Sequence, residues 1–249
     1  MILLKNDSEI EIMAEGGKKL ARVKNALGNA VKAGVRASEI EELAAGLIKE
    51  EGAEASFKKV PGYRWATCVN VNEGLVHGIP VSSVIFKKGD LVSIDVGVWF
   101  KGFHTDTSIS IGIDLSAENQ KFFNTGRETL NKALKAAKEG NYIYDISKAI
   151  EETVEAGGYT AIKALVGHGI GRDLHEEPQI PCFVPGPREE SPRIEKGMVF
   201  AIEVMYTQGC DKVEVSEDGW TIAMRDGKIS GLFEDTVAVT GKGPKVLTR

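Results

Sequence analysis

The stretch Lys88-Gly-Asp-Leu-Val-Ser-Ile-Asp95 recurs 108 positions later as Lys196-Gly-Met-Val-Phe-Ala-Ile-Glu203. Each copy begins with Lys-Gly, continues in an apolar run that predicts a buried strand, and has a carboxylate six residues after the glycine. A second pattern, Lys32-x-Gly34-x5-Ile40, returns 106 positions later as Lys138-x-Gly140-x5-Ile146. Two matches at nearly the same spacing predict that one structural unit occurs twice in this chain.

The first unit is predicted to contain two helices followed by a hairpin. Apolar residues repeat at helical spacing in two stretches, and the second stretch follows Ser38, which is predicted to form a capping box with Glu41. The pattern then changes to the alternation of strands on either side of Gly102, in residues 91–100 and 108–113.

The second unit repeats this order. Ser116 is predicted to begin one helix and Asp145 a shorter one, which Gly157-Gly158 stops. Three apolar segments follow and are predicted to be strands, near residues 198–206, 219–224 and 232–239. No linker rich in Pro, Gly or Ser separates the units, so we expect a single domain over residues 1–249. Its expected class is α/β (α+β), with pseudo-repeats over about 7–113 and 116–240 related by a pseudo-twofold axis.

The composition is that of a globular protein and argues against several other classes. Of the 249 residues, 42% are hydrophobic and 27% charged, and the formal net charge of -5 argues against nucleic acid as the main ligand. No apolar run approaches the roughly 20 residues that span a bilayer, so no membrane association is expected. Three cysteines without paired spacing argue against a disulfide framework, and we expect a cytoplasmic protein and a monomer.

Three carboxylates stand in the middle of apolar segments, where carboxylates are rare. They are Asp95 in residues 92–98, Glu203 in residues 199–205 and Glu234 in residues 232–239. A buried, unpaired carboxylate costs several kcal/mol or gives up its charge. Hydrogen bonds or a buried arginine would explain one such acid, but three in separate strands favour a shared cation.

A fourth acid joins them through the geometry of the hairpin. If the hairpin turns at Lys101-Gly102, Asp106 lies within one diagonal step of the position opposite Asp95. Four carboxylates held together at neutral pH repel each other strongly, and two divalent cations would neutralise them. Oxygen ligands with some nitrogen suit Mn, Fe(II), Co or Zn. The acids therefore predict a two-metal site.

The nitrogen ligand is expected among only four histidines. His77 lies in His77-Gly-Ile-Pro80, while His168 and His175 lie in the similar segment Gly167-His-Gly-Ile-Gly-x3-His-Glu-Glu-Pro178. His104 is two residues from Asp106. A lone histidine is more often a core or surface residue than a ligand, but all four lie within or beside these motifs.

These motifs resemble the methionine aminopeptidases of the short bacterial type (type I), over nearly the whole chain. The most specific stretches are Cys68-Val-Asn-Val-Asn-Glu-Gly-Leu-Val-His-Gly-Ile-Pro80, Gly167 to Pro178, and Phe233-Glu-Asp-Thr236. That family has the pita-bread fold, a pseudo-twofold α/β arrangement that agrees with the duplication. The resemblance implies five metal ligands: Asp95, Asp106, His168, Glu203 and Glu234.

The resemblance also implies the reaction. Two divalent metal ions (Co, Mn, Fe(II), Zn or Ni) would lower the pKa of a bound water, and one would hold the α-amine of the substrate. Glu203 would be the general base, while His175 and His77 would contact the substrate and stabilise the oxyanion. The substrate would be the N-terminal methionine of peptides and nascent polypeptides, with a transient contact to the ribosome. Tyr63, Cys68 and Trp220 would line the pocket for its side chain, with Trp65 as a weaker candidate.

Three positions depart from the family pattern. The family usually has Thr-x-Glu-Pro around the strand glutamate, where this chain has Ala201-Ile-Glu203-Val204. It usually has an aromatic residue before the second histidine, where this chain has Leu174. Because no metal ligand is lost, we expect changes in rate, metal preference and pocket shape rather than in the reaction class.

Two other functions are compatible with this fold. An Xaa-Pro aminopeptidase or prolidase-like peptidase has the same ligands, but such enzymes usually carry a large N-terminal domain. A non-catalytic pita-bread module that binds proteins typically loses ligands, whereas all five are present in this sequence. Methionine excision is therefore the preferred interpretation.

Overall fold

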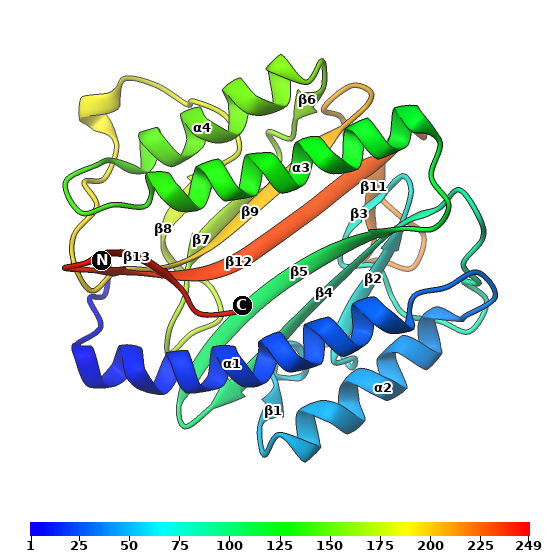
Figure 1. Cartoon of the computed structure of the whole chain (residues 1–249), viewed down its shortest axis with the longest axis horizontal. Coiled ribbons are helices and arrows are strands. Elements are labelled where there is room, and N and C mark those ends of the chain that lie inside the picture. Colours follow the sequence, from blue (N-terminus) through cyan, green and yellow to red (C-terminus); the bar gives the residue numbers. More distant parts are fainter.

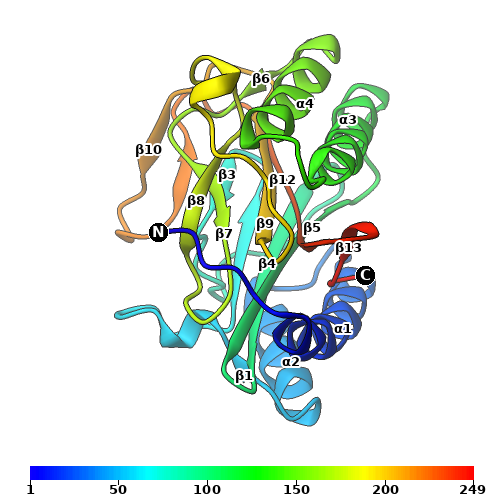
Figure 2. The same ribbon diagram turned by 90° about the vertical axis from the view of Figure 1, so that its left-hand side faces the viewer.

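The chain forms a large antiparallel sheet with four helices packed on one of its faces (Figure 1, Figure 2). The computed structural model describes all residues, Met1–Arg249. The helices are α1 (Asp7–Ala30), α2 (Ala37–Glu50), α3 (Ala117–Ala136) and α4 (Ile143–Ala156), with short 3₁₀ segments at Phe57–Lys59 and Arg188–Glu190. No helix is both long enough and apolar enough to cross a membrane.

Ten strands make the large sheet and three make a small one. The large sheet contains β1 (Glu54–Ala55), β2 (Thr67–Val71), β4 (Leu91–Phe100), β5 (Phe103–Gly112), β6 (Thr160–Ala161), β7 (Val166–Gly169), β8 (Glu176–Pro181), β9 (Val199–Thr207), β12 (Ser230–Thr240) and β13 (Gly243–Val246). Its order is β1-β4-β5-β12-β9-β7-β8, with β2 paired to β4, β13 to β12 and β6 to β9. The small sheet, β10 (Val213–Val215), β11 (Ile222–Met224) and β3 (Gly74–Val76), lies on the side away from the helices (Figure 2).

The fold contains two units, each with two helices followed by a pair of long strands. Helices α1 and α2 precede β4 and β5, and α3 and α4 precede β9 and β12. The repeated Lys-x-Gly motif turns the chain in both units, because Gly34 has φ +92° and Gly140 has φ +88°, values that favour glycine. Arg36 and Tyr142, which precede α2 and α4, each form an isolated antiparallel bridge. The predicted pseudo-twofold arrangement is therefore present down to its turns.

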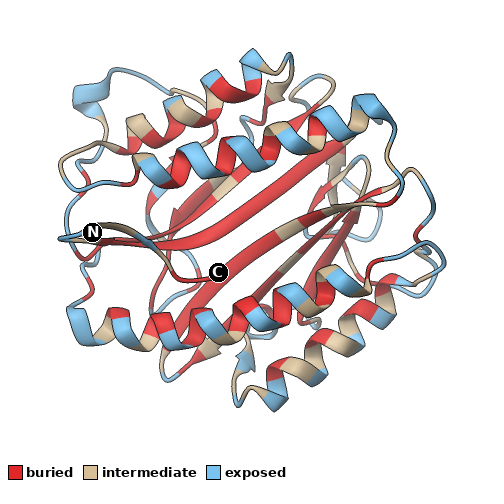
Figure 3. Cartoon of the chain, in the orientation of Figure 1, coloured by how far each residue is buried: buried red, intermediate tan, exposed pale blue.

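Each helix pair packs on the strands of its own unit. Leu20 of α1 packs in one buried cluster with Ile94 of β4, and Phe122 of α3 packs in another with Phe200 of β9. Figure 3 shows the strands buried along most of their length, while the helices expose their outer faces. Because Ile94 faces the helices, the alternation of side chains along β4 turns Asp95 to the opposite face of the sheet.

The hairpin of β4 and β5 is longer than predicted. Its second strand begins at Phe103 rather than Ser108, so pairing starts directly after the Lys101-Gly102 turn. Both turn residues have positive φ, 47° and 91°, which suits a two-residue turn between twisted strands. The register places Asp95 opposite Ser108, so Asp106 lies one diagonal step from Asp95, as predicted.

The predicted capping box of Ser38 and Glu41 is wrong. Helix α2 begins at Ala37, and the Arg36 N–H donates to Glu39 Oε2 at 2.8 Å, so Glu39 takes the role assigned to Glu41. In the second unit, Asp145 does not open α4 but lies in its first turn and accepts from the backbone N–H that precedes the helix. Sequence spacing located both helices and misplaced their first turns by a few residues.

The two units meet along β5 and β12, and this seam is narrow. Strands β4 and β5 pair at ten positions and β12 and β9 at nine. Strands β5 and β12 pair at only two: Ser108 with Glu234, and Thr107 with Asp235. The seam between the units therefore passes through the predicted site.

Candidate active site

Four residues form one row across the sheet on its helix-free face. Asp95 of β4 pairs with Ser108 of β5, Ser108 pairs with Glu234 of β12, and Glu234 pairs with Glu203 of β9. The row crosses the seam, so each unit contributes to it. Asp95 and Glu203, which are predicted to be equivalent in the two copies, stand at its two ends.

A second row lies two residues further along the strands and therefore on the same face. It contains Asp106, Thr236, Ala201 and His168. The Asp106 N–H donates to Thr236 Oγ1 at 2.9 Å, and this hydroxyl donates to the Asp106 carbonyl oxygen at 2.7 Å. Ala201, where the family has threonine, lies between Thr236 and His168. The two rows bring all five predicted metal ligands onto one patch of the sheet.

Three of these five residues have ligand atoms close enough to share a cation. One ligand atom from each of Asp106, His168 and Glu234 lies within 4.8 Å of the other two. His168 Nε2 is 3.6 Å from Glu203 Oε1. His168 Nδ1 is 2.8 Å from the Gly169 carbonyl oxygen. Because a carbonyl can only accept, Nδ1 carries the proton and Nε2 presents its lone pair to the acids.

Burial and mutual repulsion favour the neutral forms of these groups in the absence of a cation. Burial raises the pKa of Asp106 to about 7 and, with the charge of Asp106, raises the pKa of Glu203 to about 8. Burial and the neighbouring carboxylates raise the pKa values of Asp95 and Glu234 well above their ordinary range. Burial and nearby His175 lower the pKa of His168 to about 3, so its imidazole is neutral and can act as a ligand.

The donor set fits divalent metal ions better than a network of salt bridges. Asp95 Oδ1 and Glu234 Oε1 are buried and have no hydrogen-bond partner. Glu203 contacts His168, but this contact is an ion pair only if the imidazole ring of His168 is protonated. Several carboxylates with one imidazole suit Mn, Fe(II), Co, Ni or Zn. A cation would satisfy the carboxylate oxygens that the protein leaves unpaired.

A pocket of about 140 Å³ adjoins the five ligands. Its remaining lining is mostly apolar or aromatic and consists of Phe57, Val60, Tyr63, Cys68, Val76, Leu174 and Trp220, together with His77 and His175. Tyr63 packs edge-on against Trp220 with 5.1 Å between ring centroids, and its hydroxyl donates to the Thr67 carbonyl at 2.8 Å. The predicted pocket residues Tyr63, Cys68 and Trp220 all belong to this lining.

The pocket differs from the sequence-based expectation at four residues. Trp65 does not line it and instead packs edge-on against Tyr63, at 5.2 Å between ring centroids. Phe57, Val60 and Val76 line the pocket but were not predicted. Phe57 begins a short 3₁₀ segment and Val60 directly follows it, and two apolar residues at a spacing of three give only a weak signal.

The four histidines differ in exposure. His168 is buried at 7% exposure, whereas His77 and His175 line the pocket and are exposed to solvent. The rings of His168 and His175 are 4.5 Å apart between centroids. His104 is buried outside the pocket lining, and its Nδ1 lies 2.8 Å from Ser56 Oγ, so its contacts are structural.

A buried ion pair behind the site was missed by the sequence predictions. Lys24 of α1 donates to Asp235 of β12 at 2.8 Å, and these residues are 8% and 2% exposed. A signal was available, because helical spacing places Lys24 on the same face as Leu20 and Leu27. A lysine in an apolar stripe indicates a buried anionic partner.

Comparisons with known proteins agree with this arrangement. The model of metallopeptidase family M24 matches residues 11–241. A methionine aminopeptidase of Clostridium perfringens is 40% identical over 249 residues, which cover 100% of this chain and 99% of that protein. The crystal structure of a methionine aminopeptidase from Thermotoga maritima superposes with a TM-score of 0.96 at 39% identity, with 100% of both chains covered.

A more distant structure shares only the fold. A prolidase from Pyrococcus furiosus superposes with a TM-score of 0.77 at 23% identity, and 99% of this chain covers 65% of that one. The full-length similarity at higher identity is to methionine aminopeptidases. This chain therefore belongs to metallopeptidase family M24 and, within it, to the methionine aminopeptidases.

Proposed function

We propose that this protein hydrolyses the first peptide bond of peptides and nascent polypeptides that begin with methionine. Divalent metal ions would be held by Asp95, Asp106, His168, Glu203 and Glu234. The observation that carries the proposal is the convergence of these donors, with two unpaired carboxylate oxygens, beside an apolar pocket. A pocket of about 140 Å³ can take an apolar side chain. A metal ion beside it would hold the free α-amine of the substrate, which would limit cleavage to the first residue.

Two metal ions match the charge of the site. Four ionised carboxylates carry four negative charges, which two divalent cations balance. The mixed oxygen and nitrogen donors suit Co, Mn, Fe(II), Zn or Ni. When bound, such ions lower the pKa of a coordinated water towards neutrality and polarise the scissile carbonyl.

Glu203 is the proposed general base. It is half-buried, it lines the pocket, and its carboxylate lies 3.6 Å from His168 Nε2 at the end of the first row. Its carboxylate can therefore accept a proton from the attacking water and return it to the departing amine. This role needs a group that is reached from the pocket and can hold a proton near neutral pH, and Glu203 meets both conditions.

His77 and His175 are the proposed donors to the substrate. Both are exposed and line the pocket, so they can contact the scissile amide that enters it. A hydrogen bond from either ring to the carbonyl oxygen strengthens as negative charge develops there, which lowers the barrier.

The apolar wall of the pocket explains a preference for methionine. Tyr63 and Trp220 present aromatic rings, and sulfur–aromatic contacts favour a thioether side chain. Burial raises the pKa of the Cys68 thiol, so this residue is a neutral, apolar part of the wall rather than a nucleophile.

We also propose a cytoplasmic monomer that acts as a single catalytic domain on nascent chains, with a transient contact to the ribosome. The support is the absence of paired cysteines and the two structural units joined in one continuous sheet. Size-exclusion chromatography with light scattering tests the monomer, and cosedimentation with ribosomes tests the contact.

A single series of assays tests the proposed activity. Metal-stripped protein is reloaded with Mn, Fe(II), Co, Ni or Zn and assayed on Met-Gly-Met-type and Xaa-Pro peptides. We expect release of methionine with at least one metal. Cleavage of Xaa-Pro peptides without methionine release would favour the prolidase-like alternative, and a pure protein that binds no divalent ion at micromolar concentration would favour a protein-binding module.

A further inference from the structure

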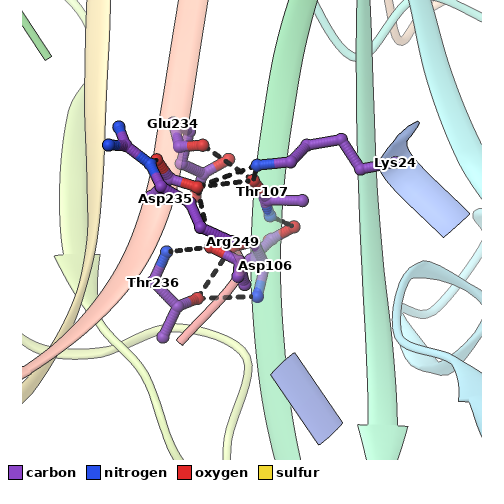
Figure 4. A network of polar contacts seen from close by, with 8 residues as sticks. Lys24, Asp106, Thr107, Glu234, Asp235, Thr236 and Arg249 are labelled. Atoms are coloured by element: carbon purple, nitrogen blue, oxygen red, sulfur yellow. Dashed lines mark hydrogen bonds and ion pairs between the residues drawn. The ribbon is translucent and has the colours of Figure 1, made fainter. Parts of the chain in front are cut away.

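A buried ion cluster lies directly behind the proposed metal ligands, on the helix side of the sheet (Figure 4). Lys24 Nζ, from α1, is 2.8 Å from Asp235 Oδ1 and 3.0 Å from Thr107 Oγ1. These two partners form one of the two register pairs that join β5 to β12. Each is also the chain neighbour of a proposed ligand, since Thr107 follows Asp106 and Asp235 follows Glu234.

Both oxygens of the Asp235 carboxylate accept hydrogen bonds. Besides Lys24, it accepts a hydrogen bond from Thr248 Oγ1 at 2.8 Å and from Arg249 Nε at 2.7 Å. The Thr107 hydroxyl donates across the seam to the carbonyl oxygen of Glu234 at 2.7 Å. Asp235 is 2% exposed, and both threonines are almost fully buried. Three segments that are distant in sequence therefore converge on one point of the seam.

Stability alone is a weak reason for such a cluster. Taking charges out of water costs several kcal/mol per ion, and well-packed apolar residues of similar volume are often at least as stable. Charge-assisted hydrogen bonds are short and directional, so they define positions more sharply than apolar contacts do. The seam has only two register pairs, so side-chain hydrogen bonds of Thr107, Ser110 and Thr236 supplement its short backbone ladder.

Metal binding on the opposite face of the sheet depends on the separation of β5 and β12. Asp106 is on β5 and Glu234 is on β12, and their ligand atoms lie within 4.8 Å of each other only because the two strands are held together at this point. The charges of the cluster suit this place, because two cations, Lys24 and Arg249, face one anion, Asp235. The cluster therefore adds no net negative charge behind the four acids.

We propose that Lys24, Asp235 and Thr107 are positioning residues that hold Asp106 and Glu234 at the separation that a divalent metal requires. They act through the backbone of the seam and touch neither the metal nor the substrate. This inference rests on the proposed ligand set and goes beyond it, because it assigns part of the metal affinity to side chains on the opposite face of the sheet.

The test compares Lys24→Met and Thr107→Val with the wild type, using the metal-stripped full chain. Both variants keep most of the side-chain volume and remove the polar link. Mn²⁺ binding is measured by isothermal titration calorimetry and by electron paramagnetic resonance of the bound ion. We expect the affinity for Mn²⁺ to fall about 10–100-fold, as when groups that orient metal ligands are removed. Excess Mn²⁺ should restore turnover, because every ligand is still present, and Lys24→Arg should retain more affinity than Lys24→Met.

Tyr206→Phe is the matched control. It removes a buried hydrogen bond to the Phe122 carbonyl, 2.6 Å long, in the helix-side core of the second unit. We expect it to lower the melting temperature and leave Mn²⁺ affinity unchanged. Wild-type affinity for Mn²⁺ in Lys24→Met and Thr107→Val would overturn the inference. It would also be overturned if the control Tyr206→Phe lost Mn²⁺ affinity in proportion to its loss of melting temperature. If Lys24→Met does not fold, Thr107→Val alone decides. A wild type that binds no Mn²⁺ would instead refute the proposed function itself.

Discussion

Asp95 and Glu203 occupy the two ends of a single cross-strand row, joined through Ser108 and Glu234. Each follows a glycine by six residues, and both glycines have positive φ, 91° and 95°. The same glycine turn thus precedes both strands and places a carboxylate at the same position along each strand. Half of the acidic patch follows from the duplication, while Asp106 and Glu234 come from the inner strands at the seam.

The metal-free protein is expected to lose stability as pH rises from about 6.5 to about 8. Below this range the buried histidines, such as His168 with its pKa lowered to about 3, oppose the effect of the acids. Within it Asp106, with a pKa near 7, and Glu203, with a pKa near 8, still hold protons in the folded state, whereas the unfolded chain has already lost them. The unfolded state then binds fewer protons, so the free energy of unfolding falls with pH. Melting temperatures in EDTA across this range test the prediction. Added Mn²⁺ should reverse the trend, because metal binds the ionised acids. A metal-free melting temperature that rises with pH would contradict it.

Glu203→Ala is expected to abolish turnover without unfolding the protein. The substitution removes a ligand and the proposed base, whose role alone is worth about 10²- to 10⁴-fold in rate. The fold should persist, because the change removes a half-buried carboxyl that the metal-free protein otherwise keeps protonated. Peptide assays and circular dichroism measure the two effects, and retained activity would refute the assignment of Glu203.

Trp220→Ala is expected to lower kcat/KM for methionine peptides by about tenfold or more, since one apolar group in a specificity pocket is worth about 1–3 kcal/mol. Trp220 lines the pocket and packs against Tyr63. Trp65→Ala is the control, because Trp65 contacts the same tyrosine without lining the pocket. Equal losses in the two variants would show that the effect comes from Tyr63 packing and not from contact with the substrate.

Lys5→Met is expected to destabilise the protein by about 3–5 kcal/mol, the usual effect of removing one partner from a buried ion pair. Lys5 and Glu176 pair with side-chain exposures of 5% and 4%, and Glu176 follows His175. Urea unfolding measures the stability, and kcat should fall as the His175 segment loses its anchor. In the exposed pair of Lys132 and Glu128, Lys132→Met should change the unfolding midpoint little. An unchanged midpoint in Lys5→Met would rule out this role of the pair.

Glu41→Ala is expected to destabilise the protein more than Glu39→Ala does. Glu41 accepts hydrogen bonds from the N–H groups of Ala66 and Thr67 at 2.8 and 2.9 Å, and both residues are fully buried. Each buried donor left unpaired costs about 1–3 kcal/mol. Glu39 accepts from one N–H at an exposed helix end, where water can replace it. Urea unfolding of both variants decides the order, and a larger loss in Glu39→Ala would contradict the structure.

Local patterns in the sequence were sufficient for the four helices, the long strands and the acidic candidate ligands, whereas the short strands were missed and only the family resemblance singled out His168. A carboxylate in an apolar run, such as Glu234, is costly to bury wherever the strand lies in the fold. It could therefore be recognised as a candidate ligand before any contact was known. The hairpin register that brings Asp106 near Asp95 depends on one turn, which glycine makes recognisable. The first turns of α2 and α4 were misplaced, because several polar residues near each helix start could serve as caps.

Contacts between distant segments were decided only by the tertiary structure. The pairing of β5 with β12 joins residues more than a hundred positions apart, and no local pattern specifies it. The ion pair of Lys24 with Asp235 follows from how the two units pack. Packing within one unit brings Glu41 to Ala66, and it also buries His168 while leaving His175 exposed. The sequence by itself determined which residues are costly to bury. Only the folded chain determined which of them meet, because their pairing depends on packing between elements that the local sequence does not encode.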